Sequence, residues 1–226
     1  MPARAAARIL TPYLVQRDFL SGGEHAALLA WALGNEARFA PAGVGGEGVR
    51  PGVRRSVSLR DLGPLAGVLK ARLKDRAAGF VETLQTTPFA VSHVELELVA
   101  HNDGAFYSRH LDTSTGDVAG HGQRVLSGVY YFHREPRGFS GGCLRLHAIR
   151  GLATDVASDD GALDAGSVDV GPDQNTLVVF PSWAPHEVMA VRCPSGAFAD
   201  SRFAVNGWLH LRRPAKGVSG FFGLRS

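Results

Sequence analysis

The chain has very little cysteine and no long apolar run. Cys143 and Cys193 are its only cysteines, too few for a disulfide framework, which fits a reducing compartment and leaves open a single bridge. No apolar stretch approaches the roughly 18 residues that cross a bilayer. The start, MPARAAARIL, lacks a continuous apolar region and a signal-peptidase site, and a transit peptide is a minor alternative because serine is absent there. We therefore expect a cytoplasmic protein with no membrane partner.

A strong charge of either sign is also absent. The formal net charge is +3, and part of the excess lies at the ends, in Arg4, Arg8 and the C-terminal segment LRRPAKGVSGFFGLRS. Proteins that bind nucleic acid usually carry a dense basic stripe interleaved with aromatic side chains. Only the tail approaches this pattern, and a solvated tail explains it as well. Nucleic acid is therefore not an expected partner, while the role of the tail and the oligomeric state stay open.

The composition that remains is that of a folded globular domain. Hydrophobic residues make up 45% of the chain and charged residues 20%, which excludes a disordered protein. A length of 226 residues suits one large domain with a sizeable core. Neither an internal repeat nor an interdomain linker is visible. We predict a single domain over residues 1–226, with a helical part at about 12–88, a β core at about 90–211 and a basic tail.

Two segments near the N-terminus show helical periodicity. In LSGGEHAALLAWALGNEARF, Ser21 can cap a helix with Glu24 completing a capping box, and Gly34 ends the apolar stripe. Residues 63–85 again carry apolar side chains at spacings of three and four. The glycine-rich stretch 41–52 between them is followed by neither Lys-Ser/Thr nor a helix, so it matches no nucleotide-binding fingerprint.

From residue 91 the periodicity changes to two. Apolar and polar residues alternate in HVELELVA, and further short segments rich in β-formers follow between clusters of Gly, Asp, Pro or Ser. These segments are VLSGVYYF, CLRLHAI, SVDV, TLVVF, HEVMAV and RFAVNGWLH. The longest polar insert, residues 150–167, is expected to be an exposed loop. Helices followed by seven or eight strands predict an α+β chain whose core is a β-sandwich or barrel.

Two polar residues in SRHLDTST are candidates for metal binding. On a strand, His110 and Asp112 point to the same face while Leu111 points to the other. The pair is a weak signal alone, because nine histidines make a chance His-x-Asp unsurprising. A rival pair lies in HNDG at 101–104, but Asn, Asp and Gly are preferred turn residues. We therefore predict that HNDG is a turn and that His110 and Asp112 are the stronger pair.

A site of this kind needs a second histidine, and His186 is the candidate. Two histidines and one carboxylate leave three positions open on non-haem Fe(II). His186 follows a buried strand and the turn PSWAP, although an ordinary edge histidine is the alternative. Arg202 shares a strand face with Trp208 in SRFAVNGWLH, so it lies inside the barrel if that face is internal. A buried guanidinium suits a dicarboxylate ligand, and a surface salt bridge is the alternative.

Taken in order, these motifs resemble the Fe(II)/2-oxoglutarate-dependent dioxygenases, specifically the prolyl-4-hydroxylase-like branch. The resemblance rests on Tyr-x-x-His-x-Asp at 107–112, RVLSGVYYF, GGCLRLH, LVVFPSWAPHEV and SRFAVNGW, over about residues 90–210. RRSVSL also resembles what precedes the core in that family. The resemblance implies a double-stranded β-helix, a jelly-roll or cupin-like barrel. It further implies an enzyme that uses Fe(II), 2-oxoglutarate and O₂, optionally with ascorbate as reductant, to hydroxylate a prolyl residue in a protein or peptide, releasing succinate and CO₂.

The resemblance also implies roles for individual residues. They are His110, Asp112 and His186 as iron ligands; Arg202 and Tyr131 for the distal carboxylate of 2-oxoglutarate, with Tyr107 as a pocket wall; and Arg124 and Trp208 on the substrate side. The chain departs from the family in two places. RCPSGAFADS lengthens the spacing between the last histidine and the arginine, which an enlarged loop tolerates. His133 stands where the family has asparagine after its YYL segment, and this bears on the substrate side rather than the metal.

Three alternatives stay open. The first keeps the iron chemistry but acts on a free amino acid or small metabolite, and the loops 113–123 and 41–52 are expected to shape the entrance that decides this. The second is a non-catalytic β-barrel that binds a ligand or senses oxygen, which the loss of an iron ligand would have favoured. The third is a cupin-type metal enzyme, which would not explain a tyrosine and an arginine placed for a dicarboxylate.

Overall fold

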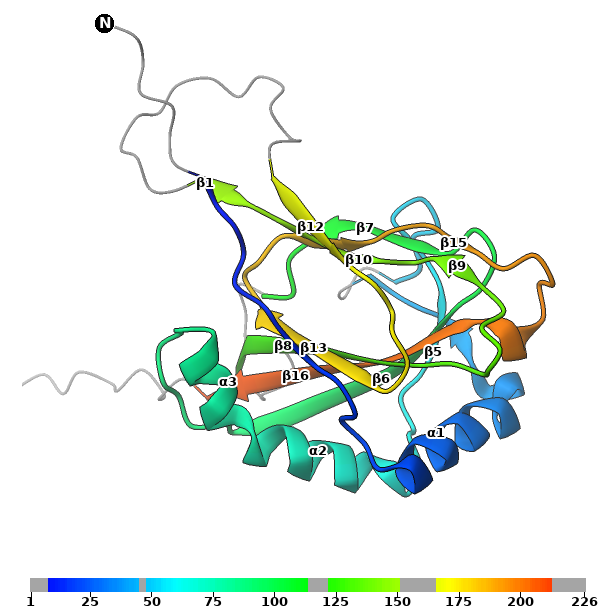
Figure 1. Cartoon of the computed structure of the whole chain (residues 1–226), viewed down its shortest axis with the longest axis horizontal. Helices are drawn as coiled ribbons and strands as arrows, with labels where there is room; N and C mark the ends of the chain where they lie inside the picture. Colours follow the sequence, from blue (N-terminus) through cyan, green and yellow to red (C-terminus); the bar gives the residue numbers. More distant parts are fainter. Residues whose placement is uncertain (1–7, 45–47, 114–121, 151–165, 213–226) are drawn as a thin grey trace, which may run out of the picture.

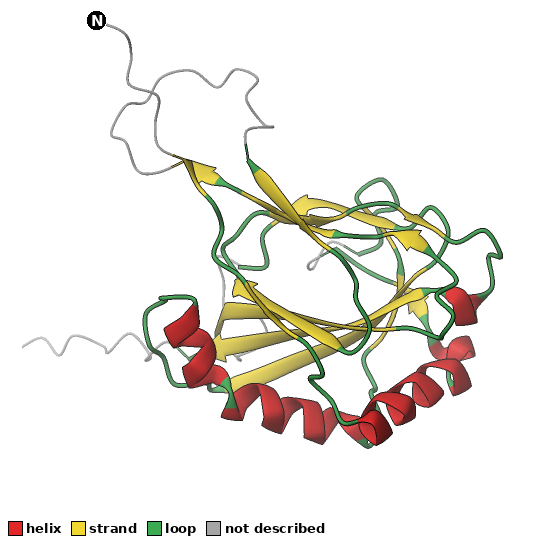
Figure 2. Cartoon of the chain, viewed as in Figure 1, coloured by secondary structure: helices red, strands yellow, loops and turns green. Residues whose placement is uncertain are grey.

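Two antiparallel sheets face each other in the computed structural model, which describes residues 8–44, 48–113, 122–150 and 166–212 (Figure 1). The helices lie along the outer surface of the larger sheet (Figure 2). Most of the insert at 150–167, most of the loop at 113–123 and nearly all of the basic tail lie outside the described residues, so the predictions for them stay predictions.

Every strand pairing among the described residues is antiparallel. The larger sheet has the order β2-β13-β8-β16-β6-β5-β3, with bounds Leu14–Gln16, Thr176–Pro181, Gln123–Phe132, Arg202–Leu211, His93–His101, Val57–Leu59 and Ala40–Pro41. The smaller sheet has the order β12-β10-β14-β7-β4, with bounds Ser167–Val170, Leu144–His147, His186–Val188, Phe106–His110 and Arg54–Arg55. Two short pairs join β1 (Arg8–Ile9) to β11 (Ile149–Arg150) and β9 (Ser140–Gly141) to β15 (Val191–Arg192). The predicted α+β fold with a double-stranded β-helix core is confirmed.

The first helix begins and ends where the sequence predicts. α1 spans Gly22–Gly34, and Ser21 and Glu24 form the capping box, with the Ser21 amide donating to the Glu24 carboxylate at 2.8 Å. Such a cap satisfies amide groups that have no partner inside the helix. None of the described helices is long and apolar enough to cross a membrane.

The helical periodicity predicted over 63–85 is divided between two helices. The segment forms α2 (Leu65–Asp75) and α3 (Ala77–Thr83), which meet at Arg76. The apolar side chains of both helices belong to one core cluster under the larger sheet. A bend at the junction keeps both apolar stripes on that curved surface, whereas a straight rod would leave part of the stripe in solvent.

Strand β16 separates the two sides of the larger sheet as its alternation predicts. Phe203, Val205 and Leu209 point outward into the cluster formed with the helices. On the other face, Ala204 belongs to a second cluster between the sheets. At Gly207 an added Cβ would lie 2.9 Å from a methyl carbon of Leu73 in α2, so glycine permits the close approach of helix and strand. The inward face of β16 is therefore free to carry polar side chains.

The insert RCPSGAFADS forms an ordered cover over the start of β16. Its short helix η3 (Phe198–Asp200) places Phe198 against Phe39 and Phe203, with ring centroids 5.0 and 5.2 Å apart. The Asn102 side-chain amide donates to the Ala197 carbonyl at 2.9 Å and to the Ser201 hydroxyl at 2.8 Å. The longer spacing before Arg202 is thus absorbed by a packed loop, and the strand itself keeps its register.

Candidate active site

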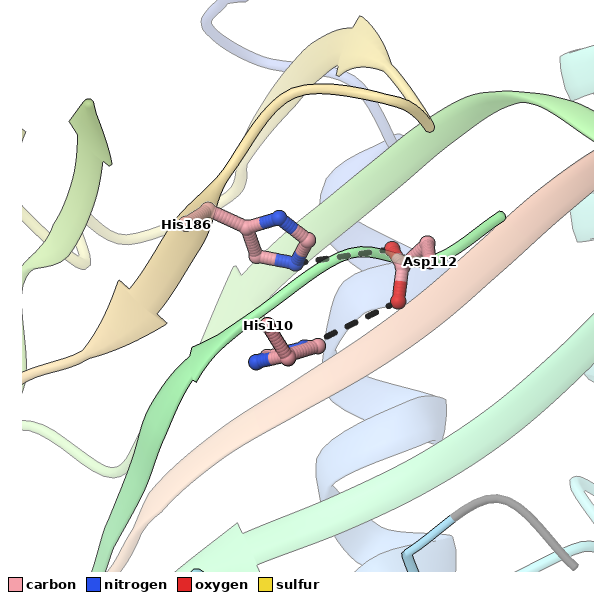
Figure 3. Close-up of side chains that lie close together, drawn as sticks. All are labelled: His110, Asp112 and His186. Carbon is pink, nitrogen blue, oxygen red and sulfur yellow. Dashed lines mark ion pairs between the residues drawn. The ribbon is translucent and has the colours of Figure 1, made fainter. Parts of the chain in front are cut away.

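Three potential metal ligands meet between the two sheets. His110 is the last residue of β7, and His186 is the first residue of β14, directly opposite it in the sheet register. Asp112 follows two residues after His110 (Figure 3). One ligand atom from each of the three lies within 4.8 Å of the others. The structure therefore brings together the residues that the motif reasoning had paired across 76 positions of sequence.

The detailed geometry differs from the prediction at Asp112, which lies just beyond the end of β7 instead of on it. Its backbone amide donates to the Ser182 carbonyl at 3.0 Å. That bond holds the backbone of Asp112 against the turn before β14. The Asp112 carboxylate therefore faces both histidines because of this bond, in addition to strand alternation.

Hydrogen bonds fix the tautomers of the two histidines. His110 Nδ1 lies 2.8 Å from the Ser108 carbonyl, and His186 Nδ1 lies 2.8 Å from the Ala184 carbonyl. A carbonyl only accepts, so each Nδ1 carries the proton and each Nε2 offers a lone pair. These Nε2 atoms lie 3.7 and 3.5 Å from the Asp112 carboxylate oxygens (Figure 3). A histidine that donates its other nitrogen to a carbonyl is the usual arrangement for a metal ligand.

The electrostatics favour the protonation states that a metal requires. Burial lowers the pKa of His110, and repulsion from His186 lowers it further. Burial alone would raise the pKa of Asp112, but His186, His110 and the Ser127 hydroxyl outweigh it, so the pKa lies below its ordinary value. A neutral imidazole and an ionised carboxylate at neutral pH are the forms that bind a cation.

The three side chains line one cavity between the sheets. Other polar residues lining it are Arg54, Arg60, Glu95, Glu97, His101, Tyr107, Arg124, Arg202, Asn206 and Trp208. Seven of the eight residues singled out from the sequence are therefore at this cavity. The eighth, Tyr131, is not among the residues that line it, but its ring centre lies 4.8 Å from the guanidinium carbon of Arg202.

Arg202 is almost completely buried, with 1% of its surface exposed, and forms no salt bridge with the described residues. Its Nε donates to the Gly142 carbonyl at 2.8 Å. An added Cβ at Gly142 would lie 2.6 Å from the Arg202 side chain, so this glycine makes room for it. The predicted internal position is confirmed, and a surface salt bridge is excluded.

Three buried polar atoms around Arg202 lack a hydrogen bond of normal geometry: Arg202 Nη2, the Tyr131 hydroxyl and His101 Nε2. The Tyr131 hydroxyl still interacts with the guanidinium, and this favours the charged form of Arg202. Arg202 Nη1 lies 3.3 Å from His101 Nδ1. Because a guanidinium only donates, Nδ1 is the acceptor and Nε2 carries the proton. Buried donors without partners are costly and rare. Three together in the part of the chain that the structure describes indicate a binding place for an anion.

The predicted turn at 101–104 is right for Asn102-Asp103-Gly104 and wrong for His101. His101 is the last residue of β6 and lies opposite Arg202 in the sheet register. The alternation of HVELELVAH extends to it, since Glu95, Glu97 and His101 share one strand face. This alternation could have predicted that His101 belongs to the strand. The turn residues that follow it favoured an earlier end of the strand.

The burial of His101 leads to a testable pH dependence. Burial, then repulsion from Arg202 and Arg54, lowers its pKa well below the ordinary value. Below about pH 6.5 the unfolded chain gains a proton here that the folded chain does not, so stability falls as pH drops. When the pH falls from about 7.5 to about 5.5, the free energy of unfolding of the wild type should decrease by about 1.4 kcal/mol more than that of His101→Gln. This difference is the value of one proton over one pH unit.

Urea unfolding at the two pH values measures this difference. Equal acid sensitivity of His101→Gln and the wild type would show that His101 accepts a proton readily in the folded state.

Farther along the cavity, charged side chains are paired with each other. Arg54 donates to Glu97 at 3.0 Å, with both side chains under 10% exposed. Arg124 donates to Glu95 at 2.8 Å and lies 3.9 Å from the Trp208 ring centre. Sequence reasoning found Arg124 and Trp208 but missed this ion pair and the Arg54–Glu97 pair.

Two further predictions concern side chains near the metal ligands. Tyr107 stacks on His110 with ring centroids 3.6 Å apart, so it forms a wall of the cavity as expected. His133 does not line the cavity. Its amide donates to the Gln174 side chain at 2.8 Å and its ring packs against Phe139. The departure from the family motif at His133 therefore does not alter the cavity wall directly.

Comparison with known proteins points to one family. Residues 96–210 match the family model of the 2OG-Fe(II) oxygenase superfamily. An uncharacterized PKHD-type hydroxylase from Synechocystis is 37% identical over 148 residues, which cover 66% of this chain and 46% of that protein. The match thus spans less than half the length of this curated relative.

Solved structures share the fold at low sequence identity. A prolyl-4-hydroxylase from Pseudomonas putida superposes with a TM-score of 0.63 at 23% identity, covering 90% of this chain and 94% of that one. A prolyl hydroxylase from Trichoplax adhaerens, solved with a peptide of a hypoxia-inducible factor, gives 0.59 at 16% identity, covering 88% and 84%. The epimerase SnoN of nogalamycin biosynthesis gives 0.52 at 16% identity, covering 95% and 87%. The shared fold alone does not choose a reaction.

Proposed function

Because the chain belongs to the 2OG-Fe(II) oxygenase superfamily, we propose that it is a 2-oxoglutarate-dependent dioxygenase that hydroxylates a prolyl residue of a protein or peptide. The reaction would consume O₂ and release succinate and CO₂. The observation that carries the proposal is a largely buried His-Asp-His cluster that shares one cavity with a fully buried arginine that forms no salt bridge with the described residues. The complete set of three candidate iron ligands argues against the binding-module alternative, and the cupin alternative does not account for that arginine. The assignment of residues 1–226 to one domain stays a prediction.

In this proposal His110, Asp112 and His186 hold Fe(II). Two neutral imidazole nitrogens and one ionised carboxylate are the ligand set of non-haem Fe(II) oxygenases, and they leave three positions open. The bound iron would supply the activation of O₂ and the attack on the C–H bond, while the protein binds, orients and excludes side reactions.

The distal carboxylate of 2-oxoglutarate would bind at Arg202. A planar guanidinium binds a carboxylate through parallel bonds, and the unpaired hydroxyl of Tyr131 and the Nε2–H of His101 would complete the donor set. This assignment gives all three orphan donors a partner. It also accounts for a buried Arg202 guanidinium that has no carboxylate partner in the protein, since the bound cosubstrate would neutralise its charge.

The substrate side would lie toward the other end of the cavity, where Arg124 stacks on Trp208. The two arginines held closely at that part of the wall are each neutralised by a glutamate, Arg54 by Glu97 and Arg124 by Glu95. Arg60 also approaches Glu95, but its side chain is 74% exposed to solvent. A wall of paired charges favours a neutral group over the free charges of an amino acid. This supports a peptidyl substrate over the small-metabolite alternative.

An anaerobic titration tests the reaction class. Fe(II) followed by 2-oxoglutarate should produce a visible charge-transfer band, because chelation by the keto acid places it on the metal. Succinate, a dicarboxylate without the keto group, is the matched control and should give no band. Absence of the band with 2-oxoglutarate would overturn the proposal.

Substrate class is tested by coupled turnover. Succinate formation in air should rise on addition of proline-containing peptides and not on addition of free proline or a pool of small metabolites. A rise with the metabolites alone would select the alternative substrate class and leave the iron chemistry intact.

A further inference from the structure

Two buried serines contact the carboxylate of Asp112. The Ser127 hydroxyl of β8 donates to Asp112 Oδ2 at 2.7 Å, and the Ser182 hydroxyl lies 2.9 Å from the Ser127 hydroxyl. Ser127 is 1% exposed and Ser182 0%. Neither serine lines the cavity, so both lie behind the metal ligand and away from any bound substrate.

The direction of this hydrogen-bond chain follows from chemistry. An ionised carboxylate only accepts, so the single proton of Ser127 must point to Asp112. Ser127 can then only accept from Ser182, and the proton of Ser182 points to Ser127. The order Ser182 to Ser127 to Asp112 is therefore fixed while Asp112 is ionised.

Ser182 also holds the backbone of the metal-binding segment. Its carbonyl accepts from the amides of Asp112 at 3.0 Å and Thr113 at 3.1 Å, and its own amide donates to the Val125 carbonyl at 2.9 Å. Both the main chain and the side chain of Asp112 are thus tied to one point, where the larger sheet meets the turn before β14.

The two oxygens of Asp112 are not equivalent in these contacts. Oδ1 faces His110 and Oδ2 faces His186 at similar distances, so the histidines alone do not choose which oxygen binds a cation. The Ser127 hydrogen bond engages Oδ2, and a charge-assisted bond of this length is a strong one. The Trp208 side chain also interacts with this carboxylate, but the short 2.7 Å bond to Oδ2 comes from Ser127.

We propose that Ser127 and Ser182 are positioning residues that restrict Asp112 to one metal bond, through Oδ1. This inference rests on the proposed function, in which iron needs three open positions for the cosubstrate and O₂. A carboxylate bound through both oxygens would occupy one of those three. The serines keep that position free by holding Oδ2.

The test counts the waters bound to a metal probe, without any turnover. Mn(II) is added to the apoprotein, and the relaxation rate of water protons is measured at saturation with no 2-oxoglutarate present. Relative to the wild type, Ser127→Ala should lower the inner-sphere contribution by about one third, because two open positions replace three. Ser127→Thr keeps the hydroxyl and should restore the wild-type value.

Ser195→Ala is the matched control. Ser195 also donates to a carboxylate at 2.7 Å, that of Asp200, but on the exposed loop before β16. It should leave the water count unchanged. Ser182→Ala, which removes the outer member of the chain, should shift the count in the same direction as Ser127→Ala and serves as the second variant if Ser127→Ala does not fold.

The outcomes separate this inference from the proposed function. An unchanged water count in both Ser127→Ala and Ser182→Ala, with Mn(II) fully bound, would overturn the positioning role. A wild type that binds Mn(II) but shows no charge-transfer band with 2-oxoglutarate would overturn the proposed function and leave the serine result standing. With both intact, turnover of Ser127→Ala should fall about 10- to 100-fold, as for other residues behind metal ligands.

Discussion

Replacement of His110 by alanine is expected to abolish Fe(II)-dependent consumption of 2-oxoglutarate, and Asp112→Ala should do the same. Residues behind a metal ligand change affinity by about 10- to 100-fold when lost, so loss of a ligand itself should lower Fe(II) affinity by at least about a hundredfold. The fold should survive, because neither side chain belongs to an apolar core cluster. Metal titration and succinate formation give the two readouts, and circular dichroism reports the fold.

His147→Gln is the matched control for these variants. His147 lies on the same small sheet and contacts a carboxylate, with Nε2 3.1 Å from Glu187, but it does not line the cavity. Metal binding and turnover should be unaffected. Unchanged succinate formation by His110→Ala would mean that the iron, if bound at all, is held elsewhere.

Local sequence patterns were sufficient for the elements that position this site. The Ser21–Glu24 capping box fixes the start of α1, because its partners are only three residues apart. Strand alternation sorts β16 into an outward apolar face and an inward face with Arg202 and Trp208, because side chains on a strand alternate by necessity. Both inferences depend on near neighbours in the chain, and both are confirmed.

Contacts between distant strands were beyond such patterns. His101 is recognisable as part of the anion pocket only once Arg202, 101 residues later, lies opposite it in the register. The same holds for the Arg54–Glu97 pair and for the Ser127–Ser182 chain, whose members are 43 and 55 residues apart. Tyr131 is a partial exception: motif order placed it near Arg202, and the pairing of β8 with β16 sets its ring against the guanidinium.

The anion pocket and the metal cluster are therefore two ends of one arrangement of strands. β16 begins with Arg202 at the pocket and passes Trp208, which pairs with Ser127 on β8. Ser127 in turn contacts Asp112. This antiparallel pair thus sets the distance between Arg202 and the Asp112 carboxylate, and the apolar outer faces of the same strands pack on the helices. Core packing on one face holds the spacing of the polar groups on the other.

Arg202→Ala is expected to raise the 2-oxoglutarate concentration needed for half-maximal turnover by about 100- to 1,000-fold. Each hydrogen bond to a charged group contributes about 1.5–3 kcal/mol, so loss of a bidentate pair costs about 3–6 kcal/mol. The lower part of that range, about 3–4 kcal/mol, corresponds to the expected change at a factor of ten per 1.4 kcal/mol, because Tyr131 and His101 would still donate to the carboxylate. Fe(II) binding should be unchanged, because Arg202 does not contact the metal ligands. Arg202→Lys should recover part of the affinity, since an ammonium supplies the charge without the planar fork.

A thermal-shift measurement gives a second readout of Arg202 that does not require turnover. Burial lowers the pKa of Arg202, which reflects the cost of holding its charge without a carboxylate partner. Arg202→Ala removes that cost. The free energy of unfolding of the apoprotein should therefore decrease by no more than the lost packing contacts of the side chain account for. Addition of 2-oxoglutarate should raise the melting temperature of the wild type, because a ligand that binds only the native state stabilises it. The melting temperature of the variant should hardly change.

Arg145→Ala controls for the loss of an arginine as such. Arg145 is paired with Asp169 at 2.7 Å on the smaller sheet, outside the cavity lining, and its variant should be stabilised by 2-oxoglutarate like the wild type. Equal stabilisation of Arg202→Ala would place the carboxylate site elsewhere. The three orphan donors would then need another anion, because leaving them buried without a partner is the costlier state.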